Sequence, residues 1–146
     1  IIISGLMIKK KIFDKIGYFN PNFNIIGDFD LIMKIAKNFN AHSTNDSLIF
    51  YRYHKNNFSK LNTEMFFNEF NEWYKNKNQL KDKNFLDNIE FFKKKLLSLE
   101  ISNLLINENK NFYLFNKILN YPVSLKKIKY FVAFFMPKIL TNYLRK

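Results

Sequence analysis

The pattern of apolar residues changes near residue 60, and this change limits most strongly the fold that the chain can adopt. Residues 48–54 alternate between two faces, which is typical of a β-strand. After Leu61 the apolar residues follow only a helical period. We therefore expect an α/β fold class with few strands over residues 1–60, followed by a mainly α-helical extension over residues 61–146.

Periodicity and turn residues also place the other elements. A strand over residues 1–8 is expected to lead into a helix that ends at a Gly17 cap, and a second helix is expected over residues 28–38. Asn-rich joints separate the later helices. These helices are expected at Thr63–Lys77, Asn84–Ile106, Lys110–Asn120 and Leu125–Lys146.

The last segment, residues 125–146, is expected to be a basic amphipathic tail that Pro137 kinks. From Tyr121 to the end there are six basic residues and no acidic ones. Such a tail could lie in the interface of an anionic membrane, or it could pack on the preceding helices, and the sequence leaves both interpretations open. Its apolar stripe consists of Ile128, Phe131, Val132, Phe135, Met136, Ile139, Leu140, Tyr143 and Leu144.

Composition limits the classes of partner and the compartment. The net charge is +12, but 22 of the 24 basic residues are lysine. Because nucleic-acid surfaces more often use arginine, no nucleic-acid partner is expected. The absence of cysteine excludes disulfides and thiolate metal sites and fits a cytoplasmic location. The longest purely apolar run, residues 130–136, is much shorter than the roughly 20 residues of a membrane-spanning helix.

Two carboxylates lie at the start of the second expected helix. Asp28 has the position of a helix N-cap, where its carboxylate accepts backbone N–H groups. It could also act as a general base, since Gly27 before it leaves room for a substrate hydroxyl. Asp30 is a secondary candidate for substrate binding, although a first-turn carboxylate also simply favours the helix dipole.

Arg52 and His54 share one face of the expected strand over residues 48–54. Arg52 is one of only two arginines, and its planar guanidinium group suits a bidentate phosphate contact that lysine cannot make. His54 alone would be an ordinary polar residue at the end of a strand. Together these side chains could hold a phosphate while a carboxylate moves a proton.

Four groups of residues occur in a characteristic order over residues 1–60. They are Ser4-Gly5-Leu6-Met7-Ile8-Lys9-Lys10, Ile16-Gly17-Tyr18-Phe19-Asn20, Gly27-Asp28-Phe29-Asp30-Leu31 and Tyr51-Arg52-Tyr53-His54-Lys55-Asn56-Asn57-Phe58-Ser59. In this order and spacing they resemble the C-terminal half of a family-two glycosyltransferase with the GT-A fold. That resemblance implies transfer of a sugar, with inversion, from a nucleotide diphosphosugar to an acceptor hydroxyl.

The resemblance also implies a role for each matching residue. Asp28 falls on the family's Glu-Asp motif and would be the catalytic base. His54 would lie at the metal and diphosphate, and Arg52 would hold the leaving group. Ser4 and Gly5 would line the sugar and acceptor side. A divalent metal, Mg or Mn, is the cofactor expected in the full-length enzyme.

The chain departs from the family pattern in ways that affect the expected activity. Gly27 stands where many members have Glu, and Lys34 stands where many have Arg. The family's nucleotide-binding strands and Asp-X-Asp motif would lie before Ile1, so the chain is expected to be a fragment that is inactive alone.

The sequence therefore predicts a fragment of an inverting hexosyltransferase of polysaccharide or glycolipid synthesis, acting on a glycan or lipid-linked acceptor. It would be cytoplasmic and peripheral at the inner face of the membrane, which it would contact through residues 125–146. The alternative is a non-catalytic basic helical module that binds a membrane surface or nucleic acid.

Overall fold

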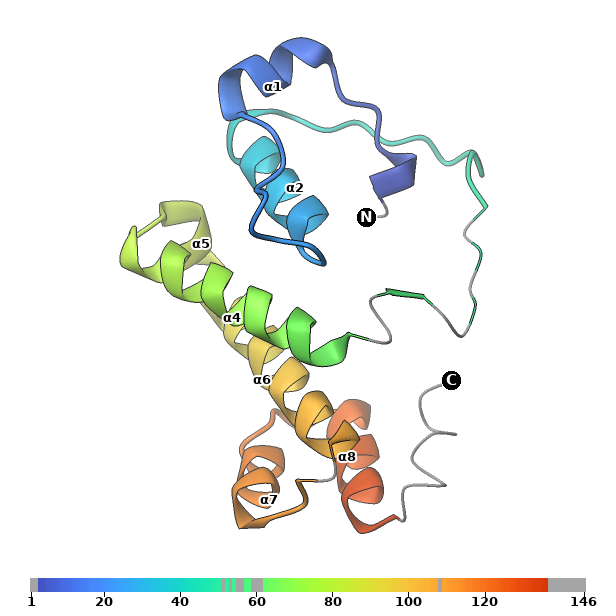
Figure 1. Cartoon of the computed structure of the whole chain (residues 1–146), viewed down its shortest axis with the longest axis vertical. Coiled ribbons are helices and arrows are strands. Elements are labelled where there is room, and N and C mark those ends of the chain that lie inside the picture. Colours follow the sequence, from blue (N-terminus) through green and yellow to red (C-terminus); the bar gives the residue numbers. More distant parts are fainter. Residues whose placement is uncertain are drawn as a thin grey trace. The chain divides into compact units, whose positions relative to one another are not determined.

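The computed structural model describes residues 3–50, 52, 54, 57–58, 62–107 and 109–136. The chain divides into two compact units, Ile1–Asn62 and Thr63–Lys146 (Figure 1). Each unit has its own helices and its own apolar contacts, and we describe each by itself.

The first unit contains a short 3₁₀ helix, η1 (Ile3–Gly5), and two α-helices, α1 (Lys10–Ile16) and α2 (Gly27–Asn38). The helix α1 ends as the sequence predicted, because Gly17 has a φ of 77° and its N–H donates to the Phe13 carbonyl. A positive φ costs glycine little, since it has no Cβ.

The core of the first unit is small. Its fully described buried apolar residues are Phe23, Ile26 and Leu31, at the start of α2 and in the loop before it. The helix α1 has no buried residue, although α1 and α2 lie against each other. Among the described residues, few buried apolar side chains therefore stabilise this unit.

The expected α/β fold class and GT-A architecture are wrong for the described part of the chain, which is helical and contains no strand. Ile3–Gly5 is a 3₁₀ helix instead of part of a strand, and residues 48–50 have no regular structure and are exposed. The alternation of residues 48–54 satisfies one requirement of a β-strand, namely side chains that point to two faces in turn. A strand also needs a neighbouring strand to satisfy its backbone N–H and C=O groups, and the described residues offer none. Tyr51 and Tyr53 lie outside the described residues.

The second unit is a set of packed helices. It contains α4 (Thr63–Gln79), α5 (Lys83–Asp87), α6 (Ile89–Ile106), α7 (Phe112–Leu119) and α8 (Leu125–Phe135). The helix α6 is central: α4 packs against it, and α7 and α8 pack against it and against each other (Figure 1).

Polar side chains cap three of these helices at their N-termini. The side chains of Asp82, Asn111 and Ser124 accept hydrogen bonds from the N–H groups of Phe85, Leu114 and Lys127. Each bond satisfies a backbone donor that has no partner within the helix. The expected helix over residues 84–106 is two helices, because α5 ends at Asp87 and α6 begins at Ile89.

Two groups of buried side chains hold the second unit together. An aromatic cluster of Phe70, Trp73, Phe85 and Phe92 joins α4, α5 and α6, with Trp73 and Phe85 each 5.2 Å from Phe92 between ring centroids. The other group joins α6, α7 and α8. It consists of Ile101, Leu114, Ile118, Tyr121 and Tyr130, packed against Leu97, Leu104, Leu105, Phe131 and Phe134.

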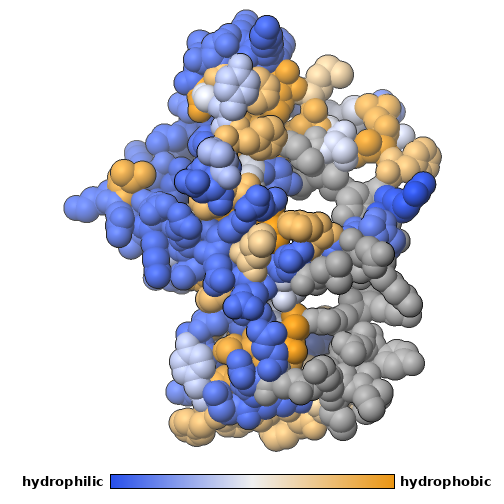
Figure 2. Space-filling model, viewed as in Figure 1, coloured by the Kyte–Doolittle hydropathy of each residue, from blue (hydrophilic) through white to orange (hydrophobic). Residues whose placement is uncertain are grey.

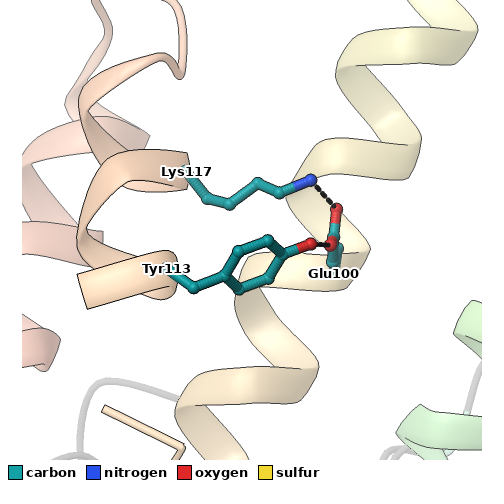
Figure 3. Close-up of polar contacts among 3 residues, drawn as sticks. All are labelled: Glu100, Tyr113 and Lys117. Atoms are coloured by element: carbon teal, nitrogen blue, oxygen red, sulfur yellow. Dashed lines mark hydrogen bonds and ion pairs between the residues drawn. The ribbon is translucent and has the colours of Figure 1, made fainter. Parts of the chain in front are cut away.

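A polar contact fixes α7 on α6 beside this second group (Figure 3). The Tyr113 hydroxyl donates to Glu100 Oε1 at 2.6 Å, and Lys117 Nζ donates to Glu100 Oε2 at 2.9 Å. Glu100 and Lys117 are both partly buried, which makes this ion pair less screened than one on an open surface.

Candidate functional site

The carboxylates predicted as site residues lie at the start of α2. Asp28 is half-buried, and one of its oxygens accepts a hydrogen bond from the Phe29 N–H at 2.7 Å. Asp30 is buried and forms an ion pair with Lys34, at 2.7 Å between Oδ2 and Nζ. The N-cap residue is Ile26, so Asp28 lies within the first turn of the helix.

The other predicted site residues of the first unit are exposed. Ser4 and Gly5 belong to η1, and Arg52 and His54 lie in chain without regular structure. The His54 N–H donates to Asn57 Oδ1 at 2.9 Å. Gly5 lies against the Ile49 side chain, because a Cβ built on Gly5 would be 2.5 Å from Ile49 Cδ1.

No described hydrogen bond or ion pair joins Asp28 to Arg52 or His54. The roles predicted for these residues, and for Ser4 and Gly5, therefore stay predictions. Among the residues that the structure describes, no group of three or more His, Asp or Glu side chains is placed to hold a metal ion. The Mg or Mn expected in the full-length enzyme stays a prediction.

The helix α8 presents an exposed apolar face. Its residues are Leu125, Ile128, Val132 and Phe135, with side chains 81%, 60%, 39% and 73% exposed. Their spacing of three, four and three residues places them on one side of a helix. We call these four residues the α8 outer face. Hydrophobic residues are visible over the α7 and α8 region at the lower end of the view in Figure 2.

The opposite side of α8 packs on the rest of the unit. Tyr130, Phe131 and Phe134 contact the buried group formed with α6 and α7. The sequence stripe had included Phe131 and left out Tyr130 and Phe134. The reason is that α8 has two apolar sides, the exposed outer face and the side that packs on α6 and α7. A search for a single apolar stripe does not separate them. The stripe residues after Met136 lie outside the described residues.

The lysines of α8 have different partners. Lys126 Nζ donates to Ser98 Oγ at 2.6 Å, and Lys127 Nζ donates to the Leu119 carbonyl at 2.5 Å. Lys129 is exposed. Lys110 reaches the other end of the helix, where its ammonium group donates to the Met136 carbonyl. A cation at a helix C-terminus stabilises the helix dipole.

No acidic residue occurs in the sequence after Glu108, whereas eight basic residues do. The α8 outer face is therefore an exposed apolar strip within a positively charged part of the chain. Large exposed apolar surfaces with a polar rim are typical of protein or membrane interaction sites.

The pKa values of two lysines in this unit shift in opposite directions. Burial disfavours the charged form of Lys117. Hydrogen bonds to Glu100 and Tyr113 outweigh this effect of burial, so the pKa of Lys117 is raised. Much of the Lys95 side chain is exposed, but partial burial of its ammonium group, together with the charge of Lys126, lowers its pKa.

We expect Lys95 to release its proton at a lower pH than Lys117 in an NMR titration of the lysine ε-CH₂ groups. Because the Lys117 pKa is raised, its contribution to stability is present below the ordinary lysine pKa and is lost as the pH rises through the raised value. Glu100→Gln should lower the Lys117 pKa and leave that of Lys95 unchanged. The reverse order of titration would contradict this interpretation of the contacts.

The described helices include none that is both long and apolar enough to cross a membrane. Comparisons with family models, with curated proteins and with solved structures find no match, so they give no support to the glycosyltransferase resemblance, which the helical fold contradicts.

Proposed function

We propose that this chain binds the surface of an anionic membrane through the α8 outer face. The observation that carries the proposal is the exposure of four apolar side chains on one side of α8, in a stretch of sequence, residues 109–146, that has no acidic residue. A helix of this kind lies in the plane of the interface, with its apolar side among the acyl chains and its lysines at the headgroups.

The expected energies are sufficient for reversible binding. Full burial of a Leu, Ile, Val or Phe side chain contributes about 1.5–3 kcal/mol. Even half of that for each of the four residues, with about 1 kcal/mol for each of two lysines near an anionic surface, is on the order of 5–8 kcal/mol. This range corresponds to dissociation constants from about 0.2 mM down to the micromolar range.

The alternative of nucleic-acid binding is less well supported. The α8 outer face is an exposed apolar strip, whereas a nucleic-acid groove needs polar contacts to phosphates and bases. Sugar transfer depended on the GT-A resemblance, so it stays an untested prediction and is not part of this proposal.

The test is binding of the full chain to vesicles. We expect it to bind vesicles that contain phosphatidylglycerol at least about tenfold more tightly than pure phosphatidylcholine vesicles, and more weakly at about 1 M salt, where charges are screened within about 3 Å. Equal binding to both vesicles, or none, would contradict the proposal. Displacement of the chain from vesicles by duplex DNA at matched charge would favour the nucleic-acid alternative.

A further inference from the structure

The helices α7 and α8 form an antiparallel pair. They pack against each other, and the ammonium group of Lys110, before α7, donates to the carbonyl of Met136, after α8. The start of α7 therefore lies beside the end of α8. Along the pair, the ring centroid of Phe115 on α7 is 6.0 Å from that of Phe131 and 5.6 Å from that of Phe134. These aromatic contacts mark the line along which the two helices meet.

The helix α7 also has exposed apolar side chains beside this line. Phe112 is 81% exposed and Leu119 is 46% exposed. Because they are seven residues apart, they lie on one side of the helix. Phe115 lies between them on the same side, three residues after Phe112 and four before Leu119, and it contacts α8. The exposed apolar side of α7 therefore begins where α7 meets α8.

The α8 outer face adjoins the same line from the other helix. Phe131, which contacts Phe115, follows Ile128 by three residues and precedes Phe135 by four. At this spacing the side chains of Ile128, Phe131 and Phe135 are neighbours on α8. Both helices thus place exposed apolar side chains next to their shared line of contact.

These exposed side chains lie on the same side of the helix pair. On each helix the buried side faces α6, because Leu114, Ile118 and Tyr130 pack with Ile101 of α6. The exposed side chains of both helices are accordingly on the side away from α6, where they form one apolar surface. We call it the α7–α8 surface, and its residues are Phe112, Leu119, Leu125, Ile128, Val132 and Phe135.

Charge indicates which partner this surface fits. The sequence after Glu108 contains eight basic residues and no acidic one. Contact between the α7–α8 surfaces of two copies of the chain would bring two such positively charged segments together, with no carboxylate from either segment to balance them. An anionic leaflet offers acyl chains for the apolar side chains and negative headgroups for the lysines. The charges therefore favour a lipid surface over a second copy of the chain.

We propose that α7 and α8 enter the interface of an anionic membrane together, with Phe112 and Leu119 among the acyl chains beside the α8 outer face. The proposal rests on the proposed function of the α8 outer face and adds a second helix to the surface that binds lipid. The pair is held on α6 by the buried apolar group and by the bonds of Glu100 to Tyr113 and Lys117. It therefore enters the interface as one unit, with both helices parallel to the membrane plane.

Replacing both Phe112 and Leu119 with asparagine tests the contribution of α7. We expect the full chain to bind phosphatidylglycerol vesicles about tenfold more weakly, a factor that corresponds to about 1.4 kcal/mol. The reason is that apolar surface which leaves water on binding is lost. The matched control is Phe91→Asn with Leu86→Asn, which removes a similar pair of exposed side chains from α6 and α5. The control should change binding by less than about threefold.

A nitroxide label on Phe112→Cys tests the position of α7 directly. With phosphatidylglycerol vesicles, we expect this label to become shielded from a water-soluble paramagnetic reagent, while a label on Leu86→Cys stays in water. The label measurement does not need the asparagine variants, so it decides the question even where one of them fails to fold.

The outcomes separate this proposal from the function on which it rests. If the chain binds vesicles but either the tenfold loss or the shielding at residue 112 is absent, α7 stays outside the interface and only the function of the α8 outer face stands. If the chain does not bind vesicles at all, both proposals fail. A dimer in analytical ultracentrifugation that the Phe112 and Leu119 double variant converts to a monomer, with no shielding by vesicles, would show that a second copy covers α7.

Discussion

Replacing both Ile128 and Phe135 with asparagine is expected to weaken binding to anionic vesicles by about 100-fold. The two side chains are 60% and 73% exposed on α8, so their loss removes apolar surface that is free to enter the lipid interface. A 100-fold change corresponds to about 2.7 kcal/mol, which is within the range for burying two such side chains partway. Vesicle sedimentation over a range of lipid concentrations measures the effect.

The control for this variant replaces two equally exposed apolar residues elsewhere in the second unit. Leu80 follows α4 and Phe91 is on α6, and they are 75% and 65% exposed. Leu80→Asn with Phe91→Asn removes a similar apolar area and should change binding by less than about threefold, or ~0.7 kcal/mol. Equal losses in the two double variants would mean that the chain binds by general hydrophobicity and that the α8 outer face has no special part.

The largest effect on stability is expected for Phe92→Ala. Phe92 is 3% exposed and contacts the rings of Trp73 and Phe85. Removing a buried phenyl ring costs its transfer free energy and leaves a cavity, together about 3–5 kcal/mol. We expect the free energy of unfolding to fall by this amount in a urea titration. Trp73 is the only tryptophan, so its fluorescence reports directly on the cluster.

Phe91→Ala is the matched comparison, since Phe91 precedes Phe92 on the same helix but is mostly exposed. The same chemical change there should cost no more than about 1 kcal/mol, mainly through its edge contact with the Phe92 ring. Similar losses for both variants would show that the aromatic cluster does not hold α4, α5 and α6 together.

Much of the helical fold followed from the sequence because helices depend on local information. Periodicity and caps placed the start of α4 at Thr63, the start of α8 at Leu125 and the end of α1 at Gly17, as the structure has them. The break at Asn88 was missed because the apolar pattern continues through it. The expected strand over residues 48–54 failed for a different reason, since pairing depends on a neighbour that the segment's own pattern does not specify.

The candidate site was only partly predictable. The apolar and basic character of residues 125–136 is visible in the sequence, and the membrane interpretation was one of two that it left open. Packing decides which side of α8 is covered, and Tyr130 and Phe134 lie on that side.

The central claim is that the α8 outer face enters the membrane interface, and a spin label at Ile128 tests it most directly. The chain has no cysteine, so Ile128→Cys and Leu80→Cys each give a single site for a nitroxide. With anionic vesicles, we predict that the label at 128 becomes shielded from a water-soluble paramagnetic reagent and more accessible to oxygen, while the label at 80 stays in water. Labels that remain equally accessible to the water-soluble reagent while the chain is vesicle-bound would contradict the account.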